Sequence, residues 1–440
     1  MSIETTDTLI VGGGQAGLAM SEHLSKAGVP HLILERHRIA ERWRSERWDS
    51  LVANGPAWHD RFPGLEFSAV EPALGPDVFP GKEQVADYFV AYAKQIAAPI
   101  RCGVAVTSVT RNAGRPGFRA ETSAGVIEAR SVVAATGPFQ RPIVPALVPA
   151  DALIGGAGML QIHSSAYRNP AQLPAGAVLV VGAGSSGTQI ADELQRAGRR
   201  VFLSVGPHGR PPRRYRGRDF VWWLGVLGLW DLETPPAGAE HVTIAVSGAY
   251  GGSTVDFRNL AARGMTLVGH AESFANAVMR FARDLAANIA RGDADYLALL
   301  DAADAHVAAN GLDLPEEPEA RRIGPMPLCA TEPVLSLDLA KEGIATIIWA
   351  TGFALDYSWL KLDVFDAKGK PRHRRGVSTE PGLYFLGLPW LSRRGSSFIW
   401  GVWHDAKHIA DQIAIQRNYR AYDAYAQESA KEGSAKRERA

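Results

Sequence analysis

Two glycine-rich turns constrain what this chain can fold into more than any other feature of its sequence. One turn is Gly12-Gly13-Gly14-Gln15-Ala16-Gly17, and the other is Gly182-Ala183-Gly184-Ser185-Ser186-Gly187. Each follows an apolar, strand-like run and precedes a helical pattern and a second apolar run, which is the order of a βαβ unit. The three glycines of such a unit allow a tight turn, the approach of a pyrophosphate and close packing of helix on strand. Two units predict two dinucleotides on one chain, an arrangement suited to passing a hydride between them.

In each βαβ unit, the residue at the end of the second apolar run indicates which nucleotide binds there. The first run, 31–35, ends in Glu35, and an acid at this place holds free ribose hydroxyls, as in FAD or NAD. The second run ends in Ser204, and a stretch rich in arginine follows, which suits the 2′-phosphate of NADPH. A solvated basic surface is the alternative for that stretch, and the sequence does not show which arginine binds. The expected nucleotide contacts are Gly12, Gly14, Gln15, Ala16, Gly17, Glu35 and Arg36 for FAD, and Gly182, Gly184, Ser185, Ser186, Gly187, Ser204, Arg210 and Arg213 for NADPH.

Length, charge and cysteine content limit the class of protein. A chain of 440 residues is too long for one ordinary core. Its 47 basic and 46 acidic residues give no charge excess that would point to nucleic acid. The two cysteines, Cys102 and Cys329, do not form a CxxC motif, so we expect no disulfide scaffold, metal site or dithiol centre. The start of the chain does not resemble a signal peptide and no apolar run is long enough for a membrane span, which predicts a cytoplasmic enzyme.

A repeated tripeptide suggests how the domains are connected. Ala135-Thr136-Gly137 and Ala350-Thr351-Gly352 each follow a hydrophobic strand, so the chain is expected to leave one domain and return to it near bound nucleotide. The predicted fold is α/β, with two Rossmann-like dinucleotide-binding domains and the NADPH domain inserted in the FAD domain. The expected parts are 1–155 for the first part of the FAD domain, 156–330 for the NADPH domain with a helical insertion at about 219–325, 331–417 for the second part of the FAD domain, and 418–440 for a polar, fraying tail.

The segment before the second glycine turn carries a family resemblance. In residues 158–168, His163, Tyr167 and Arg168 match the pattern Phe-x-Gly-x-x-x-His-x-x-x-Tyr/Phe-Lys/Arg, although the Phe is absent and Gly158 lies one residue too early. With the two turns, this pattern resembles the class B flavin-dependent monooxygenases. The resemblance covers roughly residues 1–415 and implies FAD, NADPH, molecular oxygen and a small-molecule substrate.

The resemblance also implies roles for particular residues. Asn54 and the neighbouring tryptophans are expected to face the flavin, with Asn54 as a mere turn residue being the alternative. For His163 the alternative is an ordinary core or loop histidine. Gly387 falls near a third flavin motif, where the usual following aspartate is replaced by Leu388. The implied flavin-contacting residues are Trp43, Trp48 and Gly387, and the implied groups for orientation and stabilisation of the oxygen adduct are Arg44, Asn54 and His163. Gly137 and Gly352, from the repeated tripeptide, are expected to lie near a bound cofactor.

The reaction implied by the family is oxygen transfer. NADPH reduces FAD, oxygen forms a C4a-(hydro)peroxyflavin, and one oxygen atom passes to a small molecule, with nitrogen or sulfur favoured. An auxin-type oxidative decarboxylase or carbon hydroxylase is an alternative, as is an NADPH-oxidising flavoprotein with a regulatory role. Arg168-Asn169-Pro170 lacks the tryptophan usual in Baeyer–Villiger members. Tryptophan-rich stretches, such as 220–230, indicate an apolar substrate site, a domain or homodimer interface, or ordinary core.

Overall fold

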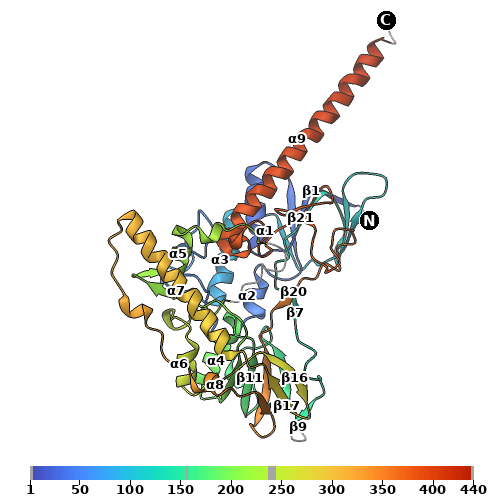
Figure 1. Ribbon diagram of the computed structural model, residues 1–440. Helices are drawn as coiled ribbons and strands as arrows, with labels where there is room; N and C mark the ends of the chain where they lie inside the picture. Colours follow the sequence, from blue (N-terminus) through green and yellow to red (C-terminus); the bar gives the residue numbers. More distant parts are fainter. Residues whose placement is uncertain (1–2, 155–156, 236–243, 438–440) are drawn as a thin grey trace.

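The computed structural model describes residues 3–154, 157–235 and 244–437. The protein is a mixed α/β structure built on two sheets whose central strands are parallel. In Figure 1 the sheet that contains β1 lies in the upper half of the molecule, and the sheet that contains β11 lies in the lower half. Each glycine-rich turn belongs to one of these sheets.

The first sheet contains the N-terminal βαβ unit. Its parallel core places Ile10 beside both Ile33 and Val133, so β1 lies in the middle. Two antiparallel strands, β4 and β5, extend it from β6. Its main order is β21 (His373–Arg374), β22 (Val377–Ser378), β23 (Leu383–Phe385), β6 (Gly125–Ala134), β1 (Glu4–Val11), β2 (His31–Glu35) and β3 (Ile100–Cys102), with β4 at Val106–Arg111 and β5 at Phe118–Thr122.

The second sheet is parallel throughout and is buried on both faces. Along β11, Val178 and Val180 face one hydrophobic cluster, whereas Leu179 and Val181 face another. Burial of both faces explains why this strand reads as a continuous apolar run rather than as an alternating one. The strand order is β10 (Leu160–His163), β19 (Ile344–Trp349), β11 (Ala177–Val181), β12 (Val201–Ser204) and β15 (Thr266–Val268).

The observed sheets differ from the expected domain organisation in two respects. Strand β19 pairs with β10 and β11, so residues 344–349 belong to the second sheet, beyond the expected boundary at 330. The segment expected to be a helical insertion contains helices but also strands, because β15 pairs with β12 at the end of the sheet order. The expected boundary at 155–156 lies outside the described residues. The elements of this region are α5 (Phe220–Val226), α6 (Phe257–Ala262), α7 (Leu285–Asn310), α8 (Leu328–Thr331), and the three-stranded sheet of β16 (Ala271–Ala275), β17 (Val278–Phe281) and β18 (Ser336–Asp338).

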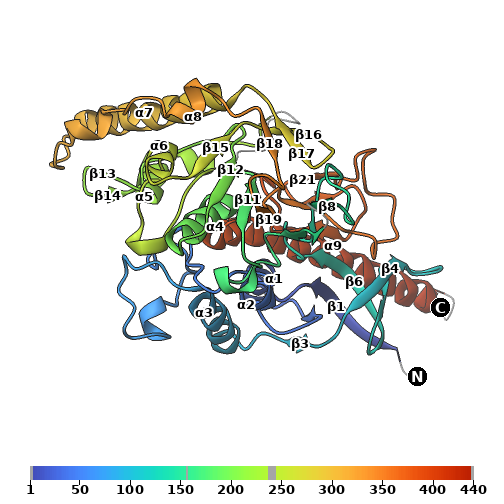
Figure 2. The same ribbon diagram turned by 90° about the horizontal axis from the view of Figure 1, so that it is seen from below.

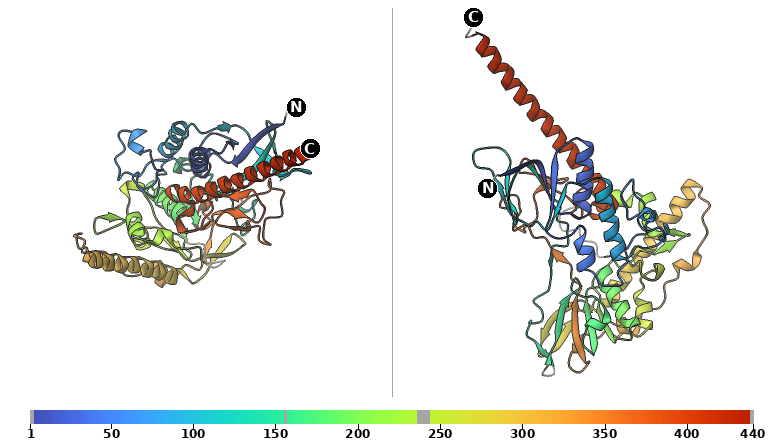
Figure 3. Two further views of the ribbon diagram at one scale, coloured as in Figure 1. Left: turned by 90° about the horizontal axis from the view of Figure 1, so that it is seen from above. Right: turned by 180° about the vertical axis from the view of Figure 1, so that it is seen from behind.

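The polar tail is helical in the structure, contrary to expectation. Helix α9 spans Ile399–Arg437, and only the last three residues of the tail, 438–440, lie outside the described part of the chain. Its first half packs on α1 (Gln15–Lys26), and the rest projects beyond the body, as Figures 1 and 3 show. Residues 417–437 are rich in Ala, Glu, Lys and Arg and contain no proline, so local propensity favours a helix without burial.

The remaining helices flank the two sheets. Helices α7 and α8 run along the outer flank of the second half, which Figure 2 shows from below. No helix in the described residues is long and apolar enough to cross a membrane. The helices next to the glycine turns are α1 and α4 (Ser185–Arg196), and the first half also contains α2 (Glu41–Ser45) and α3 (Lys82–Gln95).

Each glycine turn packs closely against the end of a neighbouring strand that Ala-Thr-Gly follows. This strand is β6 at the first turn and β19 at the second. Gly12 has φ +116°, and a Cβ on it would lie 2.5 Å from the carbonyl oxygen of Ala135. Gly182 has φ +105°, and its Cβ would lie 2.5 Å from the oxygen of Ala350. The repeated tripeptide therefore marks the same packing arrangement in both halves, because it follows the strand beside the turn. The third glycine, Gly17, lies so close to Gly12 that a side chain would overlap its carbonyl oxygen.

Replacing Gly17 by alanine is expected to destabilise the fold, because the new Cβ meets a backbone oxygen that cannot turn aside. We expect a loss of about 1–3 kcal/mol or more in the free energy of unfolding, measured by urea denaturation. Gly14→Ala is the matched control, since no atom lies within 4 Å of its Cβ and its φ of −90° suits alanine. Equal destabilisation of both variants would contradict this explanation.

Candidate active site

One cavity of about 1270 Å³ connects the two glycine turns. It opens along the carboxyl ends of β1, β2, β11 and β12, which is where open α/β sheets bind ligands. Its lining therefore brings together most of the residues predicted from the sequence. These are Gly12, Gly14, Gln15, Ala16, Glu35, Arg36, Trp43, Trp48, Asn54, Gly137, Gly182, Gly184, Ser185, Ser186, Gly187, Ser204, Gly352 and Gly387.

The first turn forms an open cradle at one end of the cavity. The Glu35 carboxylate at the end of β2 accepts hydrogen bonds from the N–H groups of Gly13, at 2.7 Å, and His37, at 2.9 Å. It is thereby fixed beside the turn, where a ribose would lie. Gln15 donates from Nε2 to the carbonyl oxygen of Ser397 at 2.8 Å, which ties the start of α1 to the segment before α9. These residues fit an adenine dinucleotide whose ribose hydroxyls are free.

The second turn forms the other end of the cavity. Ser185 donates from Oγ to the carbonyl oxygen of Ile244 at 2.8 Å, which holds the start of α4. Ser204 is buried and donates to the carbonyl oxygen of Gly269 at 2.8 Å. The backbone N–H groups at the start of α4 are available to an anion, as at other nucleotide-binding helix N-termini.

The two arginines predicted for the NADPH phosphate do not line this cavity. Arg210 is 4% exposed and pairs with Asp293 at 2.8 Å. Arg213 is 2% exposed, pairs with Asp219 at 2.5 Å and donates to the backbone oxygen of Asn54 at 2.7 Å. Both guanidinium groups are therefore neutralised in the interior, because a buried cation needs a partner. His270, which the sequence analysis missed, is a basic side chain that lines the cavity in this half.

Arg44, which was expected to help orient and stabilise the oxygen adduct, does not line the cavity either. It lies on α2 and turns away from the cavity toward α3, where it pairs with Glu83 and Asp87 at 2.5 and 2.6 Å. The two acids lie four residues apart, so α3 presents both on one face to this guanidinium. Arg44 is therefore a structural link between two helices.

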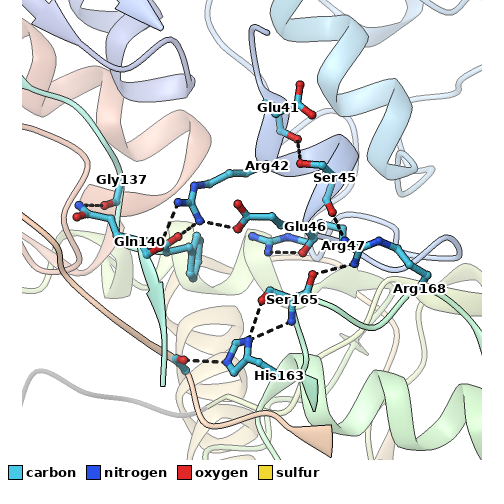
Figure 4. Close-up of polar contacts among 12 residues, drawn as sticks. Glu41, Arg42, Ser45, Glu46, Arg47, Gly137, Gln140, His163, Ser165 and Arg168 are labelled. Carbon is cyan, nitrogen blue, oxygen red and sulfur yellow. Dashed lines mark hydrogen bonds and ion pairs between the residues drawn. The ribbon is translucent and has the colours of Figure 1, made fainter. Parts of the chain in front are cut away.

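His163 is placed behind the cavity wall rather than in it. Its Nδ1 accepts the N–H of Ser165 at 3.1 Å, so Nε2 carries the proton and donates to the Gly352 carbonyl oxygen at 3.0 Å. Figure 4 shows both contacts. Burial lowers the pKa of His163, which keeps the ring neutral. The histidine thus fixes the turn at Gly352, whose backbone lines the cavity.

Asn54 lies in the cavity, on a turn of the first half, and its side chain reaches α4 of the second half. Its Oδ1 accepts from Nε2 of Gln189 at 2.9 Å, and Gln189 also donates to the Val246 oxygen at 2.8 Å. Because the amide oxygen is used, the NH₂ group of Asn54 is left to donate. Gln189 was missed from the sequence, since a buried polar residue inside an amphipathic helix gives no signal before its partner is known.

Arg47 is a further cavity residue, next in the chain to the predicted Trp48. Its guanidinium lies 5.1 Å from the ring centre of Phe139 and 5.9 Å from that of Trp43. Its one hydrogen bond to a described residue is to the Glu46 oxygen, at 3.1 Å (Figure 4). Burial, with a smaller effect of Arg42, lowers the pKa of Arg47 to about 10, so it is still charged at neutral pH. Its remaining N–H donors suit an anionic group in the cavity.

The ion pair of Arg210 predicts that this residue contributes to stability rather than to nucleotide binding. Asp293 pairs with both Arg210 and Arg258, and Arg210→Met removes the first of these buried ion pairs. Because breaking a buried ion pair is costly, we expect a loss of about 3 kcal/mol in the free energy of unfolding. NADPH affinity of the folded variant should remain within about twofold. Arg214→Met is the control, because Arg214 is exposed and should tolerate the change. A stable Arg210 variant that binds NADPH weakly would contradict the assignment.

Comparisons with known proteins agree with this geometry. Residues 9–216 match the pyridine nucleotide-disulphide oxidoreductase family. An uncharacterized CzcO-like oxidoreductase of Geobacillus kaustophilus is 33% identical over 411 residues, which cover 92% of this chain and 98% of that protein. Indole-3-pyruvate monooxygenase YUCCA1 of Oryza sativa is 34% identical over 199 residues, covering 45% of this chain and 47% of that protein.

Solved structures show the same fold. The flavin-containing monooxygenase from Stenotrophomonas maltophilia aligns with a TM-score of 0.63 at 21% identity, over 94% of this chain and 99% of that one. The partial match to YUCCA1 and the shared fold make the chain similar to class B flavin-dependent monooxygenases. The near-complete match to the Geobacillus protein shows that the chain belongs to the CzcO-like oxidoreductases.

Proposed function

We propose that the protein oxygenates a small molecule inside the cavity that joins the two glycine turns, with FAD at the first turn and NADPH at the second. The observation that carries this proposal is that a single cavity reaches both turns. A hydride donor and a flavin can therefore meet without leaving the protein. FAD supplies the activation of molecular oxygen, and NADPH supplies the two electrons.

The chain's own residues would hold the two nucleotides by different means. Glu35 is positioned for the ribose of FAD, and Gly12 and Gly14 leave room for its pyrophosphate. The N-terminus of α4 would receive the pyrophosphate of NADPH. We propose that the second sheet, from β10 to β19, forms an NADPH-binding domain inserted between two parts of an FAD-binding domain.

Three groups would arrange the reacting molecules. The Asn54 amide is held by Gln189, so its N–H groups point in a fixed direction. His163 holds the Gly352 carbonyl, and Trp48, which is 5% exposed, lines the same cavity as Asn54. An apolar lining limits the access of water, which protects reactive oxygen species from decay. None of these groups needs to act as an acid or base in this role.

The favoured target atom is nitrogen or sulfur. Oxidative decarboxylation of a 2-oxo acid is the second candidate, and the partial match to plant indole-3-pyruvate monooxygenases favours it. The products separate the two reactions. A heteroatom oxygenase adds 16 mass units to its substrate, roughly the mass of one oxygen atom, whereas a decarboxylase releases carbon dioxide.

Rapid mixing tests the oxygenase proposal. The flavoprotein is reduced with NADPH without oxygen and then mixed with oxygenated buffer while the absorption spectrum is recorded. We expect a transient spectrum that differs from both oxidised and reduced flavin, and Asn54→Ala should shorten its lifetime about tenfold by removing the directed amide. Immediate return to oxidised flavin with release of peroxide, with and without an amine or sulfide present, would contradict the proposal.

A further inference from the structure

A histidine–aspartate pair lies in the same cavity, five residues beyond Asn54. His59 shares a hydrogen bond from Nδ1 to Oδ1 of Asp60 at 2.8 Å, and its side chain is 9% exposed. The second carboxylate oxygen of Asp60 accepts the N–H of Gly55 at 3.0 Å. A Cβ on Gly55 would collide with this carboxylate, so glycine at this position allows the Asp60 side chain to pack against the turn.

The aspartate fixes which ring nitrogen of His59 is free. Because Asp60 accepts the Nδ1 proton, the neutral ring keeps its lone pair on Nε2. Among the described residues Nε2 has no hydrogen-bond partner, although the ring lines the cavity. His59 is therefore an acceptor in a fixed orientation, tied through Asp60 to the turn that carries Asn54.

Aromatic rings from three separate segments surround this histidine. The ring centre of Trp230 lies 5.6 Å away in a stacked arrangement, that of Trp400 lies 5.2 Å away edge-on, and that of Trp58 lies 5.4 Å away. Phe398 packs on Trp230 at 5.0 Å and lines the cavity as well. Of these rings, Trp230 and Phe398 line the cavity, and with Phe220, Val221 and Leu224 they give this end an apolar wall suited to a flat molecule.

The groups around this pocket favour an uncharged ligand over a cation. Both oxygens of the Asp60 carboxylate are already engaged, one by His59 and the other by the Gly55 N–H. The Arg394 guanidinium lies 5.9 Å from the ring centre of Trp230. An alkylammonium ion would therefore find the Asp60 carboxylate occupied and would lie near a positive charge, whereas aromatic amines are uncharged at neutral pH.

We infer that the pocket binds an uncharged aromatic amine, and that His59 accepts the proton of the nitrogen that is oxygenated. This inference rests on the proposed oxygenase function. The nitrogen lone pair forms the new N–O bond, one oxygen atom of O₂ stays on nitrogen, and the other leaves as water. NADPH supplies two electrons. The proton lost by nitrogen moves to Nε2 of His59 and then to solvent, giving an N-hydroxylated product.

His59→Phe separates this role from a structural one, because it keeps the ring contacts and removes both ring nitrogens. Three quantities are measured: anaerobic flavin reduction by NADPH, aniline binding by tryptophan fluorescence, and phenylhydroxylamine formed per NADPH consumed. We expect flavin reduction within about twofold of the wild type, aniline binding weakened by about tenfold or less, and product formation reduced about a hundredfold. NADPH oxidation continues, so the missing product appears as peroxide.

Two controls complete the test. His306→Phe makes the same replacement on α7 at a residue outside the cavity lining, and it should change none of the three quantities. Asp60→Asn frees the His59 ring and should also lower product per NADPH, with thermal unfolding used to confirm that the fold is intact.

The outcomes separate the two proposals. A wild-type flavin that NADPH does not reduce would overturn the proposed function and this inference with it. If NADPH reduces the flavin normally, three results would overturn this inference and leave the proposed function standing. They are no binding of aniline, a preference for cyclohexylamine over aniline, and an unchanged amount of product per NADPH in His59→Phe.

Discussion

The close contact between each glycine turn and the end of its neighbouring strand is the constraint on which the site depends. Gly12 lies against the oxygen of Ala135, and Gly182 lies against that of Ala350. In each half the next residues, Thr-Gly, then line the cavity. A side chain on either turn would push the turn away from its strand. The two halves would then no longer present their phosphate-binding ends to one shared space.

The sequence predicted the parts of this arrangement that local chemistry determines. Both βαβ units form at the glycine turns, and Glu35 and Asn54 line the cavity, while their contacts with a flavin stay predictions. The limits of the second sheet could not be predicted in the same way. Strand β19 reads as a short apolar run that suits either sheet, and only its pairing with β10 and β11 shows which sheet it joins. The continuation of the C-terminal helix through the polar tail was missed because polarity was weighted above helix propensity.

The arginines show why the charge of a residue in a sequence is a poor guide to the role of that residue. Arg210 and Arg213 follow the second strand where a phosphate-binding residue is expected, yet each meets an aspartate in the interior. The partner of Arg210, Asp293, lies on α7 far along the chain. A basic stretch that binds phosphate and one that forms buried pairs have the same composition, and only tertiary contacts distinguish them. Arg47 is the reverse case, a cation in the cavity with no carboxylate partner among the described residues.

The aromatic end of the cavity, which we propose binds the substrate, has a different origin from the ends at the glycine turns. Each nucleotide end comes mainly from one βαβ unit, so a short motif predicts it. The aromatic end combines His59, Trp230 and Phe398, which come from three short segments distant in the chain. Because no repeated backbone geometry fixes these segments, their side chains can change without disturbing the nucleotide turns. Substrate choice in this fold is thereby separated from redox chemistry, so a nucleotide motif alone predicts the reaction type and leaves the substrate open.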